Sequence, residues 1–513
     1  MAVIKVATDR DIELIKGHIY NIKFKLELLS NLYIVEQELQ ATARTVSNNI
    51  SAESDIRRTA SLVLDIDDEQ FISDNFEINW LDKLVRFYIG LEQKNGEFVY
   101  YLLGTYLLDS DNARYDATSR ELTLNLVDIM AVATQSRGNQ IGADVLIPYN
   151  SNMKNAIISF VARFLPFKRY DVVNFPDTVP YDQEFSKGTY PYDVLNQLIT
   201  LFPYYEQYYD TDGVYTVKEI PTGIGEDVFL DETVLDDLII SEERSGTIGN
   251  IKNSTEIWGA ELDAMYTASN CLTVTEGENQ TYILIMNIEL QTIEPNSTFS
   301  FVPGDSNTAT QYIQIQGVDG SYYLFDSRGD AIPAGTLVAG RSYVIKFGYV
   351  QHGQQMVGCF YLQGEEYIHV IVREMNTMPS AEEIAADKER NDCDNIKYVI
   401  NPGSPYACDR NGKRIVEGEI RQVLQGGDYS YIYTTELAYE RGAYENYVKA
   451  RLNTAVVLKT VLIPWIDVNK KIQYTSPKTG EVHQYLVKEV DMNPTEFTMT
   501  MKLVRFYNAY PWL

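Results

Sequence analysis

Histidine and cysteine, the residue types from which most metal and thiol sites are built, are scarce in this sequence. Its 513 residues include four of each. The histidines lie in separate segments without HExxH or HxH spacing, and no two cysteines form a CxxC pair. Four cysteines are also too few for a disulfide framework in a chain of this length. We therefore expect buried, reduced cysteines, no metal site and no cofactor.

Catalytic motifs in their expected contexts are missing as well. We find no Walker loop, no GxGxxG after a strand and no GxSxG elbow. Asp210-Thr211-Asp212-Gly213 resembles the front of a calcium-binding loop, but no glutamate stands at the twelfth position and the following residues alternate as a strand. A hairpin turn explains this segment better. We expect no catalytic residues and no enzymatic activity.

Positive charge is in short supply. The sequence has 43 Lys and Arg against 72 Asp and Glu, which gives a formal net charge of −29. Such a chain is not expected to bind duplex DNA nonspecifically or to bind an anionic membrane. No apolar run approaches the roughly 20 residues of a membrane helix, and charged residues interrupt the start of the chain, so we expect no secretory signal. These features predict synthesis in a cytoplasm.

Tyrosine, in contrast, is abundant, with 38 copies. Its ring packs well while its hydroxyl stays in water, so it is typical of half-buried strands and of protein interfaces. The length predicts roughly three or four domains of about 100–200 residues each.

A faint internal repeat links the beginning and the end of the chain. Each copy has a tryptophan, then a glycine suited to a hairpin turn, then a tyrosine in the following apolar run, and the two copies are offset by 384 or 385 residues. We interpret the tryptophans as equivalent core residues of two related domains. The landmarks are Trp80, Gly96 and Tyr101 in the first copy and Trp465, Gly480 and Tyr485 in the second.

Each copy is predicted to be antiparallel β-structure. Residues 61–66 and 122–126 in the first copy, and 497–501 in the second, alternate between apolar and polar side chains. A small barrel or sandwich of about five to seven strands fits this pattern.

The segments between the copies have other patterns. Helical spacing predicts helices over residues 151–165 and from Pro191, followed by a hairpin over 204–220. Residues 263–374 contain short two-faced strands, and a polar stretch, 380–393, follows. A further helix over 435–453, with Thr434 or Thr435 as N-cap, aligns a stripe of apolar residues. The stripe consists of Leu437, Tyr444, Tyr447, Val448 and Leu452.

Together these patterns predict a mainly β fold with α+β elements. It comprises two related β-barrel domains, a small α/β domain and an inserted β-sandwich-like domain. The expected boundaries are 1–135 for the N-terminal segment and first barrel, 136–228 for the α/β domain, 229–262 with 395–513 for the second barrel and one helix, and 263–394 for the insertion and a linker.

Several stretches resemble the central hub proteins of bacteriophage tails and baseplates. The segment 332–340 is also similar to small β-domains of phage tail fibres and lies where typical hubs have little or nothing. The hub-like stretches are 51–66 (SAESDIRRTASLVLDI), 192–220 (with YYDTDGVYTVKEI), 245–259 (SGTIGNIKNSTEIWG), 401–406 (NPGSPY) and 463–474 (IPWIDVNKKIQY).

The resemblance implies a structural homotrimer in the virion, at the tail tip or baseplate, assembled in the host cytoplasm. Three chains with two barrels each would present six similar docking edges to a sixfold tail tube. The implied partners are a tail tube or distal tail protein, a tape measure protein, and tip, spike or fibre proteins. DNA would pass through the ring without specific binding, and an acidic wall would repel its phosphates.

An alternative function stays open at this point: a tail adhesin whose inserted β domain binds a host-surface glycan or protein. Tyr322-Tyr323 could stack on sugar rings, although adjacent tyrosines on a strand are more often ordinary alternating residues.

Overall fold

The computed structural model confirms a mainly β fold with several sheets and few helices. The chain forms two compact units, which we call unit 1 (Met1–Ile251 with Leu452–Leu513) and unit 2 (Lys252–Arg451). None of the helices among the described residues combines the length and apolar character that a bilayer span requires. The structure describes residues 8–17, 21–65, 83–116, 118–148, 150–176, 178–222, 226–308, 310–326, 329–352, 355–402, 404, 406–408, 418–450 and 453–504.

The first copy of the repeat supplies six strands of an 11-stranded sheet in unit 1. They pair in the order β1-β4-β5-β6-β3-β2, and β1 is antiparallel to both β4 and β2, so the pairings close into a ring. Alternate side chains of β3 and β6 are buried, as the period of two predicts. The strands are β1 (Ile22–Leu29), β2 (Val35–Ser51), β3 (Arg58–Asp65), β4 (Leu84–Glu92), β5 (Phe98–Asp116) and β6 (Glu121–Asp128).

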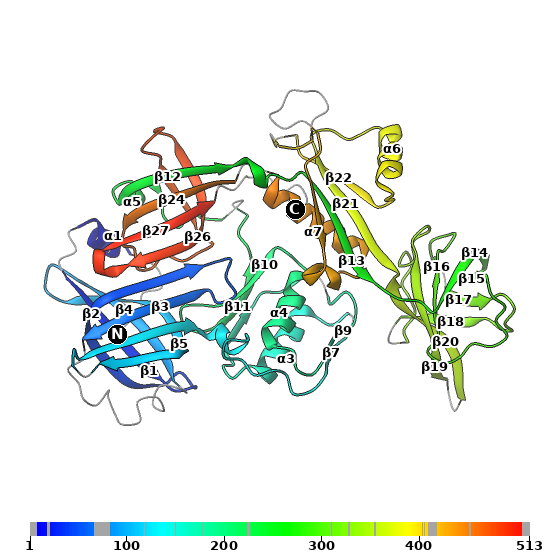
Figure 1. Cartoon of the computed structure of the whole chain (residues 1–513), viewed down its shortest axis with the longest axis horizontal. Coiled ribbons are helices and arrows are strands. Elements are labelled where there is room, and N and C mark those ends of the chain that lie inside the picture. Colours follow the sequence, from blue (N-terminus) through cyan, green and yellow to red (C-terminus); the bar gives the residue numbers. More distant parts are fainter. Residues whose placement is uncertain are drawn as a thin grey trace. The chain divides into compact units, whose positions relative to one another are not determined.

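The second copy repeats this strand order. Its strands pair as β25-β26-β27-β24-β12, which matches β4-β5-β6-β3-β2, and all neighbours in both series are antiparallel. β2 also pairs with β26 through Asn48–Met492 to Ser51–Glu489, so the two copies share one sheet (Figure 1, blue and red strands). The strands are β12 (Ile239–Thr247), β24 (Asn453–Val461), β25 (Lys471–Thr475), β26 (Val482–Asn493) and β27 (Thr498–Val504).

Unit 2 interrupts one hairpin of the second copy. In the first copy, residues 52–57 join β2 to β3. In the second copy the corresponding strands, β12 and β24, are joined through the whole of unit 2, yet Thr247 still pairs with Asn453. Because the two chain ends of the insertion leave from neighbouring strands, unit 2 is a domain inserted at the tip of a hairpin.

Excision of the insertion is therefore expected to leave a folded unit 1. The change replaces residues 248–452 by the six residues 52–57, the natural connection of the equivalent hairpin. We expect a soluble protein with cooperative thermal unfolding and a β-type circular dichroism spectrum, because β12 and β24 keep their pairing. An aggregated or noncooperative product would show that the second copy depends on unit 2 for folding.

The rest of unit 1 contains the α/β segment between the copies. The predicted helices at 151–165 and from Pro191 and the hairpin over 204–220 are confirmed, and Gly213 takes the positive φ of +74° that the turn requires. Its elements are α3 (Met153–Phe164), α4 (Pro191–Thr200), β7 (Val145–Ile147), β8 (Tyr170–Val172), β9 (Gln183–Phe185), β10 (Tyr205–Tyr209) and β11 (Tyr215–Glu219), and unit 1 also contains α1 (Asp9–Lys16) and α5 (Glu232–Leu235).

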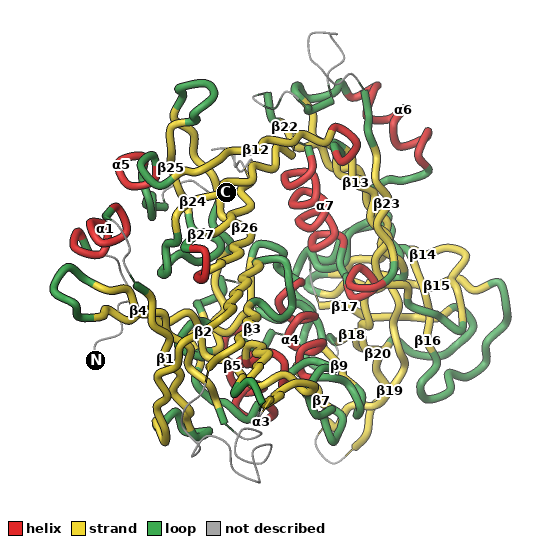
Figure 2. Tube along the Cα trace, turned by 60° about the vertical axis from the view of Figure 1, so that its left-hand side comes forward, coloured by secondary structure: helices red, strands yellow, loops and turns green. Residues whose placement is uncertain are grey.

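Unit 2 contains a four-stranded sheet with helix α7 (Thr435–Lys449) against one face (Figure 2). Thr434 caps α7 as expected, since its hydroxyl accepts a hydrogen bond from the Leu437 amide. The predicted apolar stripe is wrong at Val448, which is exposed, because α7 approaches the sheet through small residues around Gly442. The other elements are β22 (Ile396–Ile400), β21 (Tyr367–Met375), β13 (Ser254–Glu261), β23 (Arg421–Gln425) and α6 (Ala381–Asn391).

The inserted β module of unit 2 is a closed barrel, which corrects the predicted sandwich-like arrangement. β14 pairs with both β15 and β16, and β19 joins β16 to β20, so none of the described strands of the module is a free edge. Tyrosine and phenylalanine side chains fill its core. The strands are β14 (Tyr266–Glu276), β15 (Asn279–Met286), β16 (Thr298–Phe301), β17 (Thr310–Ile315), β18 (Tyr322–Phe325), β19 (Tyr343–His352) and β20 (Gln355–Glu365).

Candidate functional site

A buried group of polar side chains joins the two copies and the α/β segment within unit 1. We call it the junction cluster and define it by Arg57, Arg58, Glu206, Asp467 and Asn469. These residues come from three of the hub-like sequence stretches, which lie far apart in the chain.

Arg58 connects three parts of unit 1. Its side chain is fully buried at the start of β3. Nη1 donates to the carbonyl oxygen of Tyr209 on β10 at 2.6 Å, and Nη2 pairs with Asp467 Oδ2 in the second copy, also at 2.6 Å. The Arg58 amide donates to Asp128 Oδ2 at 2.9 Å, at the end of β6. One residue thus ties both copies to the hairpin between them.

Arg57, which precedes Arg58 in the sequence, contributes a second set of contacts to the cluster. Its guanidinium lies 3.7 Å from the ring centroid of Tyr208 and pairs with Glu206 on the same strand, β10. Glu206 also accepts a hydrogen bond from Asn469 Nδ2 in the second copy. The Asn469 side-chain oxygen in turn accepts from Lys488 Nζ of β26 at 3.0 Å.

Burial sets the protonation of these groups. It raises the pKa of the Asp128 carboxyl to about 6, although the Arg58 amide and guanidinium oppose the shift. Burial disfavours the charged guanidinium of Arg58, but Asp467 together with Tyr106, Asp128 and Tyr208 more than offsets this, and the pKa of Arg58 is raised. Burial also lowers the pKa of the Lys488 ammonium. Charges this deeply buried are tolerated only where their partners are held in place.

The geometry of the cluster is that of a structural connection between three parts of unit 1. It contains no serine, cysteine or histidine nucleophile with a general base beside it. In the described part of the chain, no group of His, Cys, Asp and Glu side chains is arranged to hold a metal ion. All four cysteines are buried and free, which confirms the prediction of buried, reduced cysteines. The cluster connects the two copies and the α/β segment through hydrogen bonds and ion pairs.

The sequence landmarks occupy corresponding places in the two copies. Gly96 turns the β4–β5 hairpin with φ +82°, and Gly480 turns the β25–β26 hairpin with φ +70°. Tyr101 on β5 and Tyr485 on β26 are both buried. These placements agree with the repeat.

The two tryptophans of the repeat are less easily compared. Trp80 lies outside the described residues. Trp465 is half-buried and packs against the apolar core that both copies share, with its ring centroid 5.2 Å from that of Tyr101. The structure therefore brings together a tryptophan of one copy and a tyrosine of the other. The equivalence of Trp80 and Trp465 stays a prediction.

Sequence reasoning did not identify the junction cluster, although the hub-like stretches contained its members. The available signal was the pair of adjacent arginines, Arg57 and Arg58, at the start of an alternating strand. Neighbouring side chains on a strand point to opposite faces, so at least one arginine was expected to face the core. Helix α6 was also missed in the polar stretch 380–393. Ser380 and Glu383 form a capping box there, which is a recognisable helix start.

Solved structures of tail and baseplate proteins are similar to this chain over most of its length. The tail protein of prophage MuSo2 from Shewanella oneidensis is 10% identical with a TM-score of 0.45, covering 94% of this chain and 98% of the other. A tail protein from Neisseria meningitidis is 7% identical with a TM-score of 0.45, covering 95% and 98%. A chain of the phage P2 baseplate in its activated conformation is 8% identical with a TM-score of 0.27, and the match covers 94% of this chain and 98% of the other.

A family described as a domain of unknown function, DUF5048, matches residues 404–510. No curated protein matches the sequence. The descriptions of these three structures name tail or baseplate proteins, and a PdpA-VgrG complex from Francisella is a further neighbour, with a TM-score of 0.40 and 9% identity.

Proposed function

We propose that this chain is a structural hub of a phage tail tip or baseplate, and that it acts as a homotrimer between a sixfold tail tube and a threefold distal tip. The observation that carries the proposal is the doubled strand order: β4-β5-β6-β3-β2 recurs as β25-β26-β27-β24-β12 in one continuous sheet. A chain whose sheet contains two similar sets of strands can present six similar surfaces when three copies surround an axis.

The free edges of the sheet support assembly through strands. Among the described strand pairings, β12 has a partner on one side only, β24. An unpaired edge is a template for another chain, and natural proteins usually cover it. In a ring of three chains, such edges would be covered by the neighbouring subunit or by a tail tube or distal tail protein. A tape measure protein and tip, spike or fibre proteins are the other partners of this proposal.

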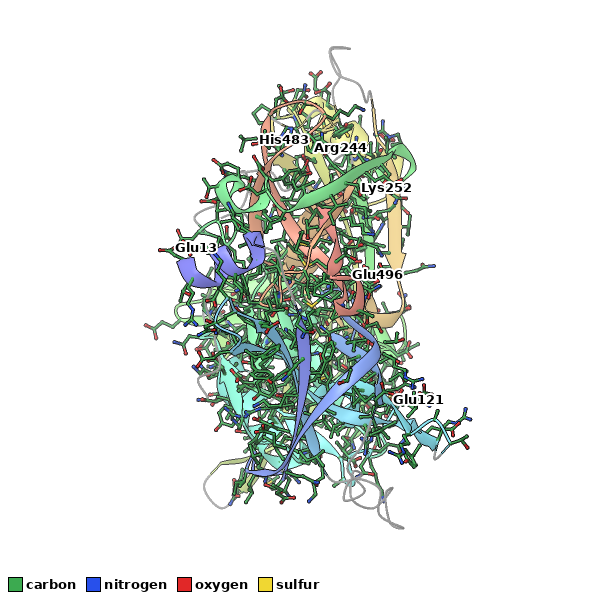
Figure 3. All side chains as sticks on the ribbon, turned by 90° about the vertical axis from the view of Figure 1, so that its left-hand side faces the viewer. Glu13, Glu121, Arg244, Lys252, His483 and Glu496 are labelled. Carbon is green, nitrogen blue, oxygen red and sulfur yellow. The ribbon has the colours of Figure 1, made fainter. Side chains whose placement is uncertain are left out.

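The acidic composition fits a channel through which DNA passes. The chain carries a net charge of −29, and carboxylates such as Glu13 and Glu496 of unit 1 are exposed (Figure 3). A wall of this sign repels phosphate groups, so DNA would pass without specific binding. The proposal places no catalytic step in this protein.

The mass of the purified chain in solution tests the hub proposal. Sedimentation equilibrium at micromolar concentration is expected to give three times the chain mass of 58.5 kDa. A monomer or a dimer across the accessible concentration range would contradict a trimeric hub.

An adhesin function of the inserted barrel is the second candidate. The observation that favours it is an exposed aromatic surface on the barrel, centred on Tyr323, which is 43% exposed.

A further inference from the structure

The outer face of the barrel carries a row of side chains that crosses five strands. Strand register places these residues side by side, because directly paired residues point to the same face of a sheet. The row is surrounded by the outward residues of the same strands, of which Leu272 on β14 is 49% exposed. Its members are Val274 on β14, Thr281 on β15, Tyr312 on β17 and Tyr323 on β18, and the row ends on β20 at Cys359, which is paired with Tyr323 but buried.

Aromatic rings form the centre of this face. The ring centroids of Tyr312 and Tyr323 are 4.6 Å apart, and those of Tyr323 and Phe325 are 5.6 Å apart with planes 16° from parallel. Tyr361 continues the group on β20, where it is paired with Phe325, and its hydroxyl donates to the carbonyl oxygen of Tyr349 at 3.0 Å. The rings of Tyr312, Tyr323 and Phe325 contact one another, and the hydroxyl of Tyr361 is held by Tyr349, so the rings are ordered before any ligand arrives, which reduces the entropy cost of binding.

Uncharged hydrogen-bonding groups surround the rings. Thr281 lies on one side of the row, Gln314 follows Tyr312 on the same face of β17, and Gln363 follows Tyr361 on β20. Hydroxyl and amide groups can each both donate and accept hydrogen bonds. They are therefore suited to a ligand that is rich in hydroxyl groups.

Charge is sparse on this face, although the chain carries a net charge of −29: Lys346 of β19 lies beside Tyr361, and Glu276 of β14 lies beside Asn279 at the margin. The part of the face nearest the rings has no outward Asp, Glu, Lys, Arg or His side chain. It comprises residues 270–274 of β14, 279–285 of β15, 310–314 of β17 and 357–363 of β20. One cation and one anion at separate margins give a charged polymer no run of complementary charge. A neutral ligand fits the charge of the surface.

We propose that this face, centred on Tyr312, Tyr323 and Phe325, is a binding platform for a neutral oligosaccharide. The aromatic rings supply flat apolar area for the C–H faces of sugar rings, and the side chains of Thr281, Gln314 and Gln363 supply hydrogen bonds to sugar hydroxyl groups. Aromatic residues are also enriched at protein interfaces, so binding of a protein through this face is the alternative outcome that the test below distinguishes. The platform deepens the adhesin function proposed above and does not depend on trimer formation.

The test measures binding of the full-length chain to an array of neutral oligosaccharides built from hexoses, 6-deoxyhexoses and N-acetylhexosamines, with charged glycans on the same array. We expect the wild-type chain to bind at least one class, and Tyr323→Ala to weaken that binding at least tenfold. Gln314→Ala is a second variant that removes a hydrogen-bonding group without removing a ring. Tyr367→Ala is the matched control, because Tyr367 is 56% exposed on β21, outside the barrel, and its loss should leave binding unchanged.

Three results would overturn the platform: no binding of any neutral sugar, equal binding by wild type and both platform variants, or binding restricted to charged glycans. A wild-type chain that recognises a tail protein through this face, and no sugar, would also overturn it. Sedimentation of Tyr323→Ala separates the two proposals, because the variant should keep the mass of the wild-type assembly. Loss of sugar binding with an unchanged mass concerns the platform alone, and a changed wild-type stoichiometry concerns the hub alone.

Discussion

Replacing Arg58 by alanine is expected to lower the free energy of unfolding of unit 1 by about 3–5 kcal/mol. The substitution leaves Asp467 without its cationic partner and the carbonyl oxygen of Tyr209 without its 2.6 Å hydrogen bond. A buried charge without a partner costs far more than the pair contributes when intact. Urea denaturation followed by circular dichroism, together with hydrogen exchange of the β3 and β24 amides, measures the change.

Arg44→Ala is the matched control for this experiment. Arg44 also pairs with two carboxylates, Asp65 and Glu121, but its side chain is 51% exposed, so its removal should cost less than about 1 kcal/mol. Combining Arg58→Ala with Asp467→Ala should cost less than the sum of the two single changes, because the double variant leaves no unpaired charge. Equal, small effects of Arg58→Ala and Arg44→Ala would show that the junction cluster does not hold the copies together.

Alanine at Tyr101 and alanine at Tyr485 are expected to destabilise unit 1 by similar amounts, about 3–5 kcal/mol each. Tyr101 is fully buried and its hydroxyl donates to Asp11 Oδ1 at 2.8 Å. Tyr485 is 2% exposed, and its ring centroid is 5.4 Å from that of Tyr474. Each substitution leaves a cavity in the shared core at corresponding positions of β5 and β26.

Thermal and urea unfolding of both variants measures this prediction, with Tyr170→Ala as a control. Tyr170 also belongs to unit 1 but is 42% exposed, so its loss should change stability by less than about 1 kcal/mol. A large effect at Tyr101 with a negligible effect at Tyr485, or the reverse, would show that the two positions do not carry equivalent packing.

Local sequence patterns predicted much of the strand and helix content of the fold. The Gly96 and Gly480 turns could be recognised because a tight hairpin needs a positive φ that glycine adopts without strain. The offset between the copies likewise placed Tyr101 and Tyr485 on corresponding strands. These features depend on neighbours in the sequence, which is why one sequence suffices to find them.

Features that depend on distant pairings could not be predicted. The β2–β26 pairing, which makes one sheet of the two copies, depends on the register between residues more than 400 positions apart, and alternation within a strand does not encode its partner. Closure of the inserted barrel depends in the same way on the pairing of β14 with β16. The exposed Val448 shows a further limit, since small residues such as Gly442 can determine the packed face of a helix.

The junction cluster falls between these two cases. Its residues belong to the sequence stretches that resemble tail hubs, so the sequence identified the stretches. It did not predict that these residues contact one another. Tyr209 and Asp467 follow Arg58 by 151 and 409 positions in the sequence. Only the folded chain shows that Arg58 is hydrogen-bonded to both.

Electron cryomicroscopy of the assembled protein tests the central claim most directly, because it shows both the number of chains and the arrangement of their sheets. We expect a ring of three chains in which the β4-β5-β6-β3-β2 and β25-β26-β27-β24-β12 sheets alternate at six similar positions around the axis. A ring in which only one of the two sheets faces the axis, or an assembly without threefold symmetry, would contradict it.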